Sequence, residues 1–270
     1  MAKGTKRDRR RQYAIRRMLK KALCVVLLVL LVLAYIGIRK QESAGAQGAG
    51  TQEISGLVST QKAGGQPGNP EGDFSLDMVP AYSGRAYVDI NGDGPFFTRE
   101  EMTAEAFHEY WPLDDLGRCT GAYACVGLET LPTQERGDIS SVKPTGWNTN
   151  RYSDIDGEML FNRCHLIGHL LTGQDANERN LITGTRYMNV EGMLPFEESV
   201  VRYVEGTGHH VMYRVRPYFD GDNLVCAGVL MEAESVEDPL VRFCAFCYNV
   251  QPGFEIDYKT GDNRRANTPD

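Results

Sequence analysis

The chain has 270 residues, enough for one large domain or two small ones, and a formal net charge of −7. Residues 1–40 contain twelve basic residues and one acidic residue, a net of +11, whereas the rest contains 17 basic and 35 acidic residues, a net of −18. An acidic domain repels polyanions. This excludes nucleic-acid binding driven by overall charge and leaves only binding through a local cluster of cations.

The first 72 residues are expected to form three segments. Residues 1–21 are basic, residues 22–38 form an uninterrupted apolar run of 17, and residues 39–72 are rich in Gly, Ala, Gln and Ser. The run is at the short end for a membrane helix, which needs about 20 residues. Because basic flanks stay in the cytoplasm, we expect a single-pass transmembrane signal anchor with the following chain outside the cell. A flexible linker then leads to a domain at residues 73–270.

Cleavage of a secretory signal is the alternative for this region. Ala44, Gly45 and Ala46 fit a cleavage site, and the domain would be secreted after cleavage near Ala46. Arg39 and Lys40 separate the apolar run from that site and disfavour cleavage, so we expect an uncleaved anchor.

Apolar and turn patterns predict a mixed domain. A short strand is expected at residues 86–90, then helices that begin at Thr98 or Thr103 and run through residues 107–111. Residues 158–161 are expected to lead as a strand into residues 162–165. Helices are then expected at residues 185–192 and 196–203, and strands at residues 209–218, 224–234, 241–250 and 254–258. This order predicts an α+β fold, an antiparallel sheet with an inserted strand–loop–helix unit.

Six cysteines lie in the predicted domain, and an even number in an exported domain permits disulfides. The pairings first expected are Cys119 with Cys125, and Cys226 with Cys244 or Cys247. Burial as free thiols is the alternative. Cys244 and Cys247 have a zinc-like spacing, but no second pair accompanies them. On the predicted strand, positions three apart face opposite sides.

Two polar runs, Asn162-Arg163-Cys164-His165 and residues 180–189, lie among turn signals within about thirty residues of each other. A neutral histidine can take a proton from water near physiological pH. A hard cation such as Mg²⁺ takes oxygen ligands and keeps several waters, so one or two protein oxygens suffice. The runs therefore suit a single-metal phosphodiesterase.

The side chains that meet these requirements are few. His165 supplies the imidazole, and Asn189 with Glu197 or Glu198 supplies oxygen ligands. Forked donors that match phosphate come from Arg163 and Arg186.

The same runs resemble a known family. Residues 161–174 (Phe-Asn-Arg-Cys-His-Leu-Ile-Gly-His-Leu-Leu-Thr-Gly-Gln) and 180–189 (Asn-Leu-Ile-Thr-Gly-Thr-Arg-Tyr-Met-Asn) are similar to the DNA/RNA non-specific endonucleases of the ββα-metal type. Their secreted and DNA-entry (competence) branch is the most similar. The resemblance extends to residues 143–147 and 249–253 and covers roughly residues 82–261. It implies that the inserted unit is a ββα-metal motif.

The resemblance also implies roles for the site residues. His165 would be the general base, Asn189 the direct Mg²⁺ ligand, and Glu198 the residue that holds metal-bound water, with Glu197 as the alternative. Supporting and phosphate-facing roles would fall to Asn180, Arg163 and Arg186.

Two positions depart from the family, in which Asp is common at position 162 and Gly or Ser at position 164. Asn162 keeps the oxygen but lacks the charge that would orient Arg163. Cys164 is bulkier, and a disulfide there would distort His165.

Three other sites are compatible with parts of the sequence. His165 and His169 have a zinc spacing if they are helical, but no clear third ligand. Cys164 beside His165 suggests a thiol hydrolase, although adjacent strand residues point to opposite faces. Residues 89–100 match a calcium-loop pattern, but a strand rather than a helix enters the loop.

The sequence thus predicts a metal-dependent endonuclease that uses Mg²⁺, with Mn²⁺ as a substitute, to hydrolyse phosphodiester bonds outside the cell. DNA is the expected substrate and RNA a second one, and the resemblance implies products with 5′-phosphates. A catalytically silent surface module of the same fold, which binds nucleic acid or a protein, is the alternative. A calcium-dependent adhesion domain is a third.

Overall fold

The structure is a computed structural model and describes residues 74–267. Its main element is a six-stranded antiparallel sheet. All five neighbouring pairs of strands run antiparallel. From edge to edge the strands are β1 (Tyr87–Asp89), β8 (Arg242–Tyr248), β7 (Gly228–Ser235), β6 (Val211–Tyr218), β3 (Ala122–Val126) and β2 (Phe107–Tyr110).

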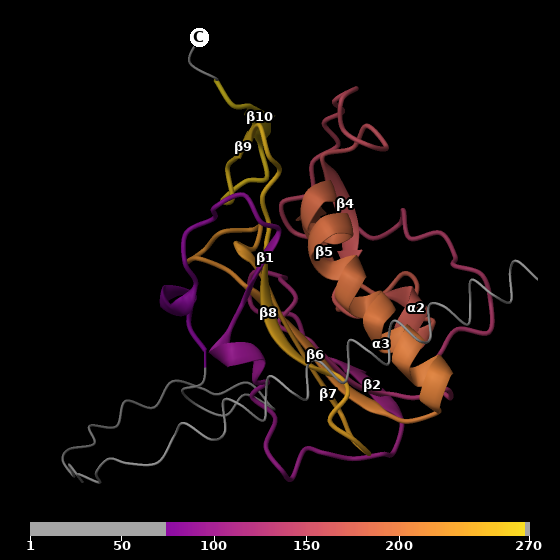
Figure 1. Ribbon diagram of the computed structural model, residues 1–270. Coiled ribbons are helices and arrows are strands. Elements are labelled where there is room, and N and C mark those ends of the chain that lie inside the picture. The colour runs from indigo at the N-terminus through magenta and orange to yellow at the C-terminus, as the bar shows by residue number, and fades with distance from the viewer. Residues whose placement is uncertain (1–73, 268–270) are drawn as a thin grey trace, which may run out of the picture. The chain divides into compact units, whose positions relative to one another are not determined.

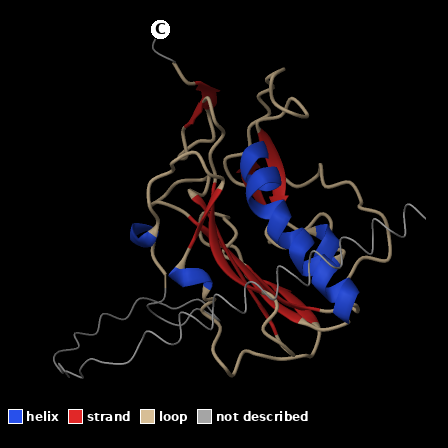
Figure 2. Ribbon diagram, viewed as in Figure 1, coloured by secondary structure: helices blue, strands red, loops and turns tan. Residues whose placement is uncertain are grey.

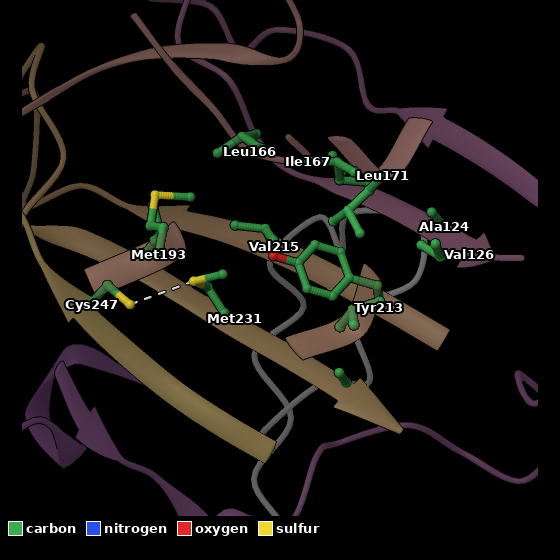
Figure 3. Close-up of a cluster of buried hydrophobic side chains, with 14 of the residues drawn as sticks. Ala124, Val126, Leu166, Ile167, Leu171, Met193, Tyr213, Val215, Met231 and Cys247 are labelled. Atoms are coloured by element: carbon green, nitrogen blue, oxygen red, sulfur yellow. Dashed lines mark hydrogen bonds between the residues drawn. The ribbon is translucent and has the colours of Figure 1, made fainter. Parts of the chain in front are cut away.

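Both faces of this sheet bury side chains, because residues alternate between the faces along each strand. Tyr213 and Val215 of β6 belong to the larger core cluster, together with Met231 and Cys247, whose sulfur atoms are 3.5 Å apart (Figure 3). Cys244 belongs instead to a smaller cluster on the other face. The prediction that Cys244 and Cys247 face opposite sides is confirmed.

A two-stranded unit carries the polar runs. β4 (Phe161–His165) pairs antiparallel with β5 (Leu181–Thr185), with His165 opposite Leu181. The short helix α2 (His169–Thr172) lies between these strands in sequence, and a π-helical turn, Met188–Met193, leads into α3 (Leu194–Thr207). In Figure 1, α3 lies beside β4 and β5 on one side of the large sheet. A last hairpin pairs β9 (Phe254–Ile256) with β10 (Asn263–Arg265).

The predicted α+β class agrees with this architecture, in which an antiparallel sheet is accompanied by few helices (Figure 2). The helices predicted from Thr98 or Thr103 through residues 107–111 are wrong. Phe107–Tyr110 is strand β2 and pairs along its whole length with β3. The helix-start pattern at Thr98 does form a local contact, because Glu101 Oε2 accepts the Thr98 N–H at 2.7 Å. Long-range pairing overrides such local preferences.

The helices predicted at residues 185–192 and 196–203 form one continuous element, the π-helical turn followed by α3. Pro195 stands in the first turn of α3, where the missing N–H of proline costs no helical hydrogen bond. Gly206 lies inside α3, and the helix ends at Gly208, whose φ of 72° suits a glycine cap.

The expected disulfides are not formed. All six cysteines between residues 74 and 267 are free and buried. Cys119 donates its thiol proton towards the carbonyls of Glu178 and Leu181 at 3.3 Å, and Cys125 towards the carbonyl of Thr103 at 3.1 Å. Burial raises the pKa of both thiols to about 12. The open alternative, burial as free thiols, is the one observed.

The predicted basic segment (1–21), anchor (22–38) and linker (39–72) lie outside the described residues. Within residues 74–267, no helix has both the length and the apolar character needed to cross a bilayer.

Candidate active site

A cavity of about 660 Å³ lies where β4, the π-helical turn and the start of α3 meet. Polar side chains from segments far apart in sequence face it. The ones used below are Arg136, Arg163, His165, Arg186, Asn189 and Glu197. The cavity therefore brings together His165 and Asn189, the two residues on which the predicted chemistry depends.

The side chain of His165 is held as a neutral imidazole. His165 ends β4, is only 7% exposed, and places Nε2 3.0 Å from the main-chain oxygen of Asp175. A carbonyl oxygen only accepts, so Nε2 carries the proton and Nδ1 is left with a free lone pair. Burial, aided by the nearby Arg136 and opposed by the bond to Asp175, lowers the pKa of His165 to about 4. The ring is therefore uncharged at neutral pH.

Glu197 and Asn189 are the oxygen donors of the cavity. Glu197, in the first turn of α3, is buried, and its Oε1 accepts the N–H of Gly168 at 2.8 Å. Burial raises the pKa of Glu197 to about 7, although the nearby Arg136 opposes this shift. Neither Oε2 of Glu197 nor the amide of Asn189 makes a hydrogen bond to any residue in the range 74–267.

This donor set fits a hard divalent cation that keeps most of its waters, because it offers one amide oxygen and one carboxylate. It does not fit a site built of several carboxylates, imidazoles or thiolates. No group of three or more His, Cys, Asp or Glu side chains in the described part of the chain is arranged to hold a metal.

Glu198, predicted as the carboxylate of the metal site, does not line the cavity. Its side chain is 54% exposed and pairs with Arg202 at 3.3 Å on the outside of α3. Successive residues of a helix point about 100° apart, so only one of Glu197 and Glu198 can face inward. The structure turns Glu197, the predicted alternative, towards the cavity and Glu198, the residue first predicted, towards solvent.

Arg186 lines the cavity and is fixed at both ends of its fork. Its Nη2 lies 2.5 Å from Oδ2 of Asp156, and its Nη1 donates to Oδ1 of Asn162 at 3.3 Å. Asn162 thus uses its amide oxygen to orient Arg186, whereas the sequence suggested Arg163 as its partner.

Arg136 was not predicted as a site residue. It is exposed, lines the cavity, and makes no hydrogen bond or ion pair with the residues that the structure describes. It lies in a loop between β3 and β4 without apolar periodicity. No pattern in the sequence distinguishes this arginine from others on the surface.

Arg163 and Asn180 hold main chain in place. Arg163 donates to the carbonyls of Val142 (2.5 Å) and Ser140 (3.0 Å), and its guanidinium stacks on Trp147 at 4.1 Å. It also lines the cavity, but its donors are already used by the loop before β4.

Asn180 is fully buried and outside the cavity. Its amide accepts from the N–H of Ile167 and donates to the carbonyl of the same residue, each at 2.9 Å. Asn180 therefore shapes the turn that follows His165 and has no path to a substrate.

Cys164 and His169 do not form the alternative sites. The thiol of Cys164 lies in the core, where burial strongly raises its pKa, and Gly184 across the hairpin leaves room for it. His169 begins α2 while His165 ends β4, so the two do not share a helix.

Within the stretch that matches a calcium-loop pattern, residues 91–94 form a tight turn. A hydrogen bond from Asn91 Nδ2 to the Gly94 carbonyl at 2.9 Å closes this turn.

A neutral imidazole, an amide and a buried carboxylate around one cavity, with arginines at its edge, are the groups of a metal-assisted phosphodiester hydrolase. The chain belongs to the DNA/RNA non-specific endonuclease family, whose sequence pattern matches residues 99–237, just over half of the chain. It is therefore a nucleic-acid hydrolase, and metal dependence is typical of this family.

Solved nucleases share the fold. NucA from Streptococcus agalactiae with bound magnesium superimposes with a TM-score of 0.59 at 23% identity, over 66% of this chain and 86% of NucA. The Sda1 nuclease with bound zinc gives a TM-score of 0.59 at 22% identity, over 72% of this chain and all of Sda1. At these identities the likeness establishes the fold alone.

Proposed function

We propose that the chain is a Mg²⁺-dependent non-specific endonuclease that cleaves DNA, with RNA as a second substrate and Mn²⁺ as a substitute cation. One observation carries this proposal. The Nδ1 lone pair of His165 is free, and the unbonded oxygens of Asn189 and Glu197 face the same cavity.

In this proposal His165 takes a proton from the attacking water, because burial keeps its imidazole neutral at the pH of the reaction. Arg186 and Arg136, both at the cavity, bind the phosphate of the substrate. Arg163 and Asn180 position the loops around them.

Asn189 and Glu197 would hold the cation. A bound divalent cation supplies charge neutralisation of the phosphate and acidifies its own waters. The magnesium in NucA and the zinc in Sda1 support a divalent ion in this fold, and the all-oxygen donor set favours Mg²⁺ over zinc.

We further propose that the enzyme works outside the cell, held by a single-pass anchor at residues 22–38, or secreted if it is cleaved near Ala46. The apolar run and its basic flank support this placement. A solved relative described as an extracellular endonuclease, 16% identical with a TM-score of 0.50, is compatible with it. Protease treatment of intact cells should remove the domain if the anchor orientation is right and leave it intact if it is not.

The decisive experiment uses protein that begins near Gly72, plasmid DNA, and Mg²⁺ or EDTA. We expect cleavage with Mg²⁺, none with EDTA, and a loss of at least about 100-fold in His165→Ala, because general-base catalysis contributes this much. Glu197→Ala should lose activity, whereas Glu198→Ala, its exposed neighbour, should retain it. Plasmid that is bound but stays intact under all conditions would instead indicate a catalytically silent module.

A further inference from the structure

Asp175 contacts His165, which lines the cavity, and Gly137, the neighbour of the cavity residue Arg136. Its main-chain oxygen accepts the hydrogen bond from Nε2 of His165 at 3.0 Å, and its Oδ1 accepts the N–H of Gly137 at 2.9 Å. The same Oδ1 lies 3.6 Å from Nε2 of His169. One residue thus connects the catalytic imidazole with the loop that precedes β4.

The contact with Gly137 depends on close approach of the main chain. A Cβ atom at position 137 would lie 2.7 Å from Oδ2 of Asp175, closer than real Cβ contacts. The carboxylate therefore sits directly against this peptide, and the glycine makes that possible. The peptide it holds is the one that joins Gly137 to Arg136.

Arg136 needs such support, because its side chain makes no hydrogen bond or ion pair with any residue in the described range. The position of its main chain therefore helps to determine where the guanidinium stands. Asp175 contacts this main chain without pairing with the guanidinium, so the positive charge of Arg136 is left available to a ligand in the cavity.

We propose that Asp175 is a positioning residue for substrate binding, whose carboxylate holds the Arg136–Gly137 peptide so that Arg136 meets a substrate phosphate. This inference rests on the proposed function for the identity of the ligand. The carboxylate of Asp175 contacts Gly137 and His169, whereas the contact with His165 uses the main chain of Asp175. The bond to His165 uses the main chain and survives substitution.

The test compares Asp175→Ala, Asp175→Asn, Arg136→Ala and the double variant Arg136→Ala/Asp175→Ala with the parent protein, by steady-state cleavage of a DNA oligonucleotide in Mg²⁺. Asp175→Ala should raise KM about ten-fold, as expected for a weakened charge-assisted phosphate contact, and change kcat less than about two-fold. Asp175→Asn should restore most of the binding, because its amide oxygen can accept the Gly137 N–H.

The double variant provides the sharper readout. If Asp175 acts through Arg136, the double variant should bind no more weakly than Arg136→Ala alone. Asp220→Ala removes an exposed carboxylate that makes no hydrogen bond or ion pair with a described residue, and it should leave KM and kcat unchanged.

Additive losses in the double variant, or a fall in kcat at constant KM, would overturn the proposal. Equilibrium binding of a fluorescent DNA oligonucleotide in EDTA repeats the comparison without catalysis. If the parent protein cleaves nothing but binds DNA, and Asp175→Ala weakens binding about ten-fold, the proposed function fails while the positioning role stands. If Asp175→Ala binds like the parent protein in this assay, the positioning role fails.

Discussion

At the scale of single residues, burial sets the charge states of the site. Burial lowers the pKa of His165 to about 4, so its imidazole is uncharged at neutral pH. It raises the pKa of Glu197 from 4.5 to about 7, so the carboxylate is costly to ionise until a cation compensates its charge. The site is thus arranged for a positively charged ligand.

Stability should therefore depend on pH through Glu197. Because folding raises the pKa of Glu197, the contribution of this residue to the free energy of unfolding is full below pH 4.5. That contribution is lost as the pH rises through about 7. Glu197→Gln should raise the free energy of unfolding in EDTA by as much as about 3 kcal/mol at pH 8, and little at pH 4.5. Urea unfolding at the two pH values measures this difference.

Glu198→Gln is the control for that measurement. Glu198 is exposed and forms only a surface pair with Arg202, so its substitution should change stability by less than about 1 kcal/mol at either pH. If Glu197→Gln raised the free energy of unfolding equally at both pH values, burial would not be holding the pKa of this carboxylate at a raised value.

At the scale of elements, the approach of α2 to α3 places the carboxylate. Gly168 immediately precedes α2 and donates its N–H to Glu197 at the start of α3. Its φ of −61° and ψ of 149° suit any residue, so the backbone conformation does not require glycine. Glycine is needed because a Cβ atom would occupy the space of the Glu197 carboxylate. A Cβ there would lie 2.5 Å from Oε1 of Glu197.

Gly168→Ala should therefore displace Glu197 and weaken cation binding. We expect the Mg²⁺ concentration for half-maximal cleavage to rise about ten-fold, the effect of a perturbed carboxylate partner at a metal site. Gly206→Ala is a matched control, since position 206 lies within α3 with nothing within 4 Å of a new Cβ. It should stabilise the protein by about 1 kcal/mol and leave the Mg²⁺ dependence unchanged.

At the scale of the whole molecule, a buried ionic network lies within the large sheet. Glu232 of β7 is fully buried and pairs with Arg214 at 3.0 Å and Arg216 at 3.1 Å, both on β6. It also accepts the N–H of Phe96 at 2.8 Å. This network ties the N-terminal part of the domain to the face of the sheet opposite α3.

Removal of the shared carboxylate should be strongly destabilising. Glu232→Ala deprives two buried arginines of a partner and should lower the free energy of unfolding by about 3–5 kcal/mol. Glu255→Ala removes a carboxylate from an exposed pair with Arg264 and should cost less than about 1 kcal/mol. Urea unfolding measures the loss of unfolding free energy in both variants. Similar losses in Glu232→Ala and Glu255→Ala would show that the buried network does not cause the destabilisation.

Nucleic-acid binding should depend on salt, but only moderately. The domain after residue 40 is acidic overall, and Arg136 and Arg186 are the cations proposed for the phosphate. Two phosphate contacts predict a slope of about −2 for log K against log salt on duplex DNA, and Arg136→Ala should reduce it by about 1. Affinity that is insensitive to salt would contradict binding through these arginines.

Much of this protein is determined locally by its sequence. The alternation of apolar residues predicts β6, β7 and β8, and the family resemblance of residues 161–174 and 180–189 implies that His165 and Asn189 lie at one site. Such alternation needs only the period of strands, which every chain shares.

The tertiary structure decided what depends on contacts across the chain. Pairing with β3 made residues 107–110 a strand, and the packing of α3 turned Glu197 rather than Glu198 inward. Arg136 lines the cavity, and Asp175 contacts His165 and Gly137, from loops without periodicity, where no local rule predicts a neighbour in space. The physical reason is that side-chain direction in loops, and the phase of a helix about its axis, are set by packing partners distant in sequence.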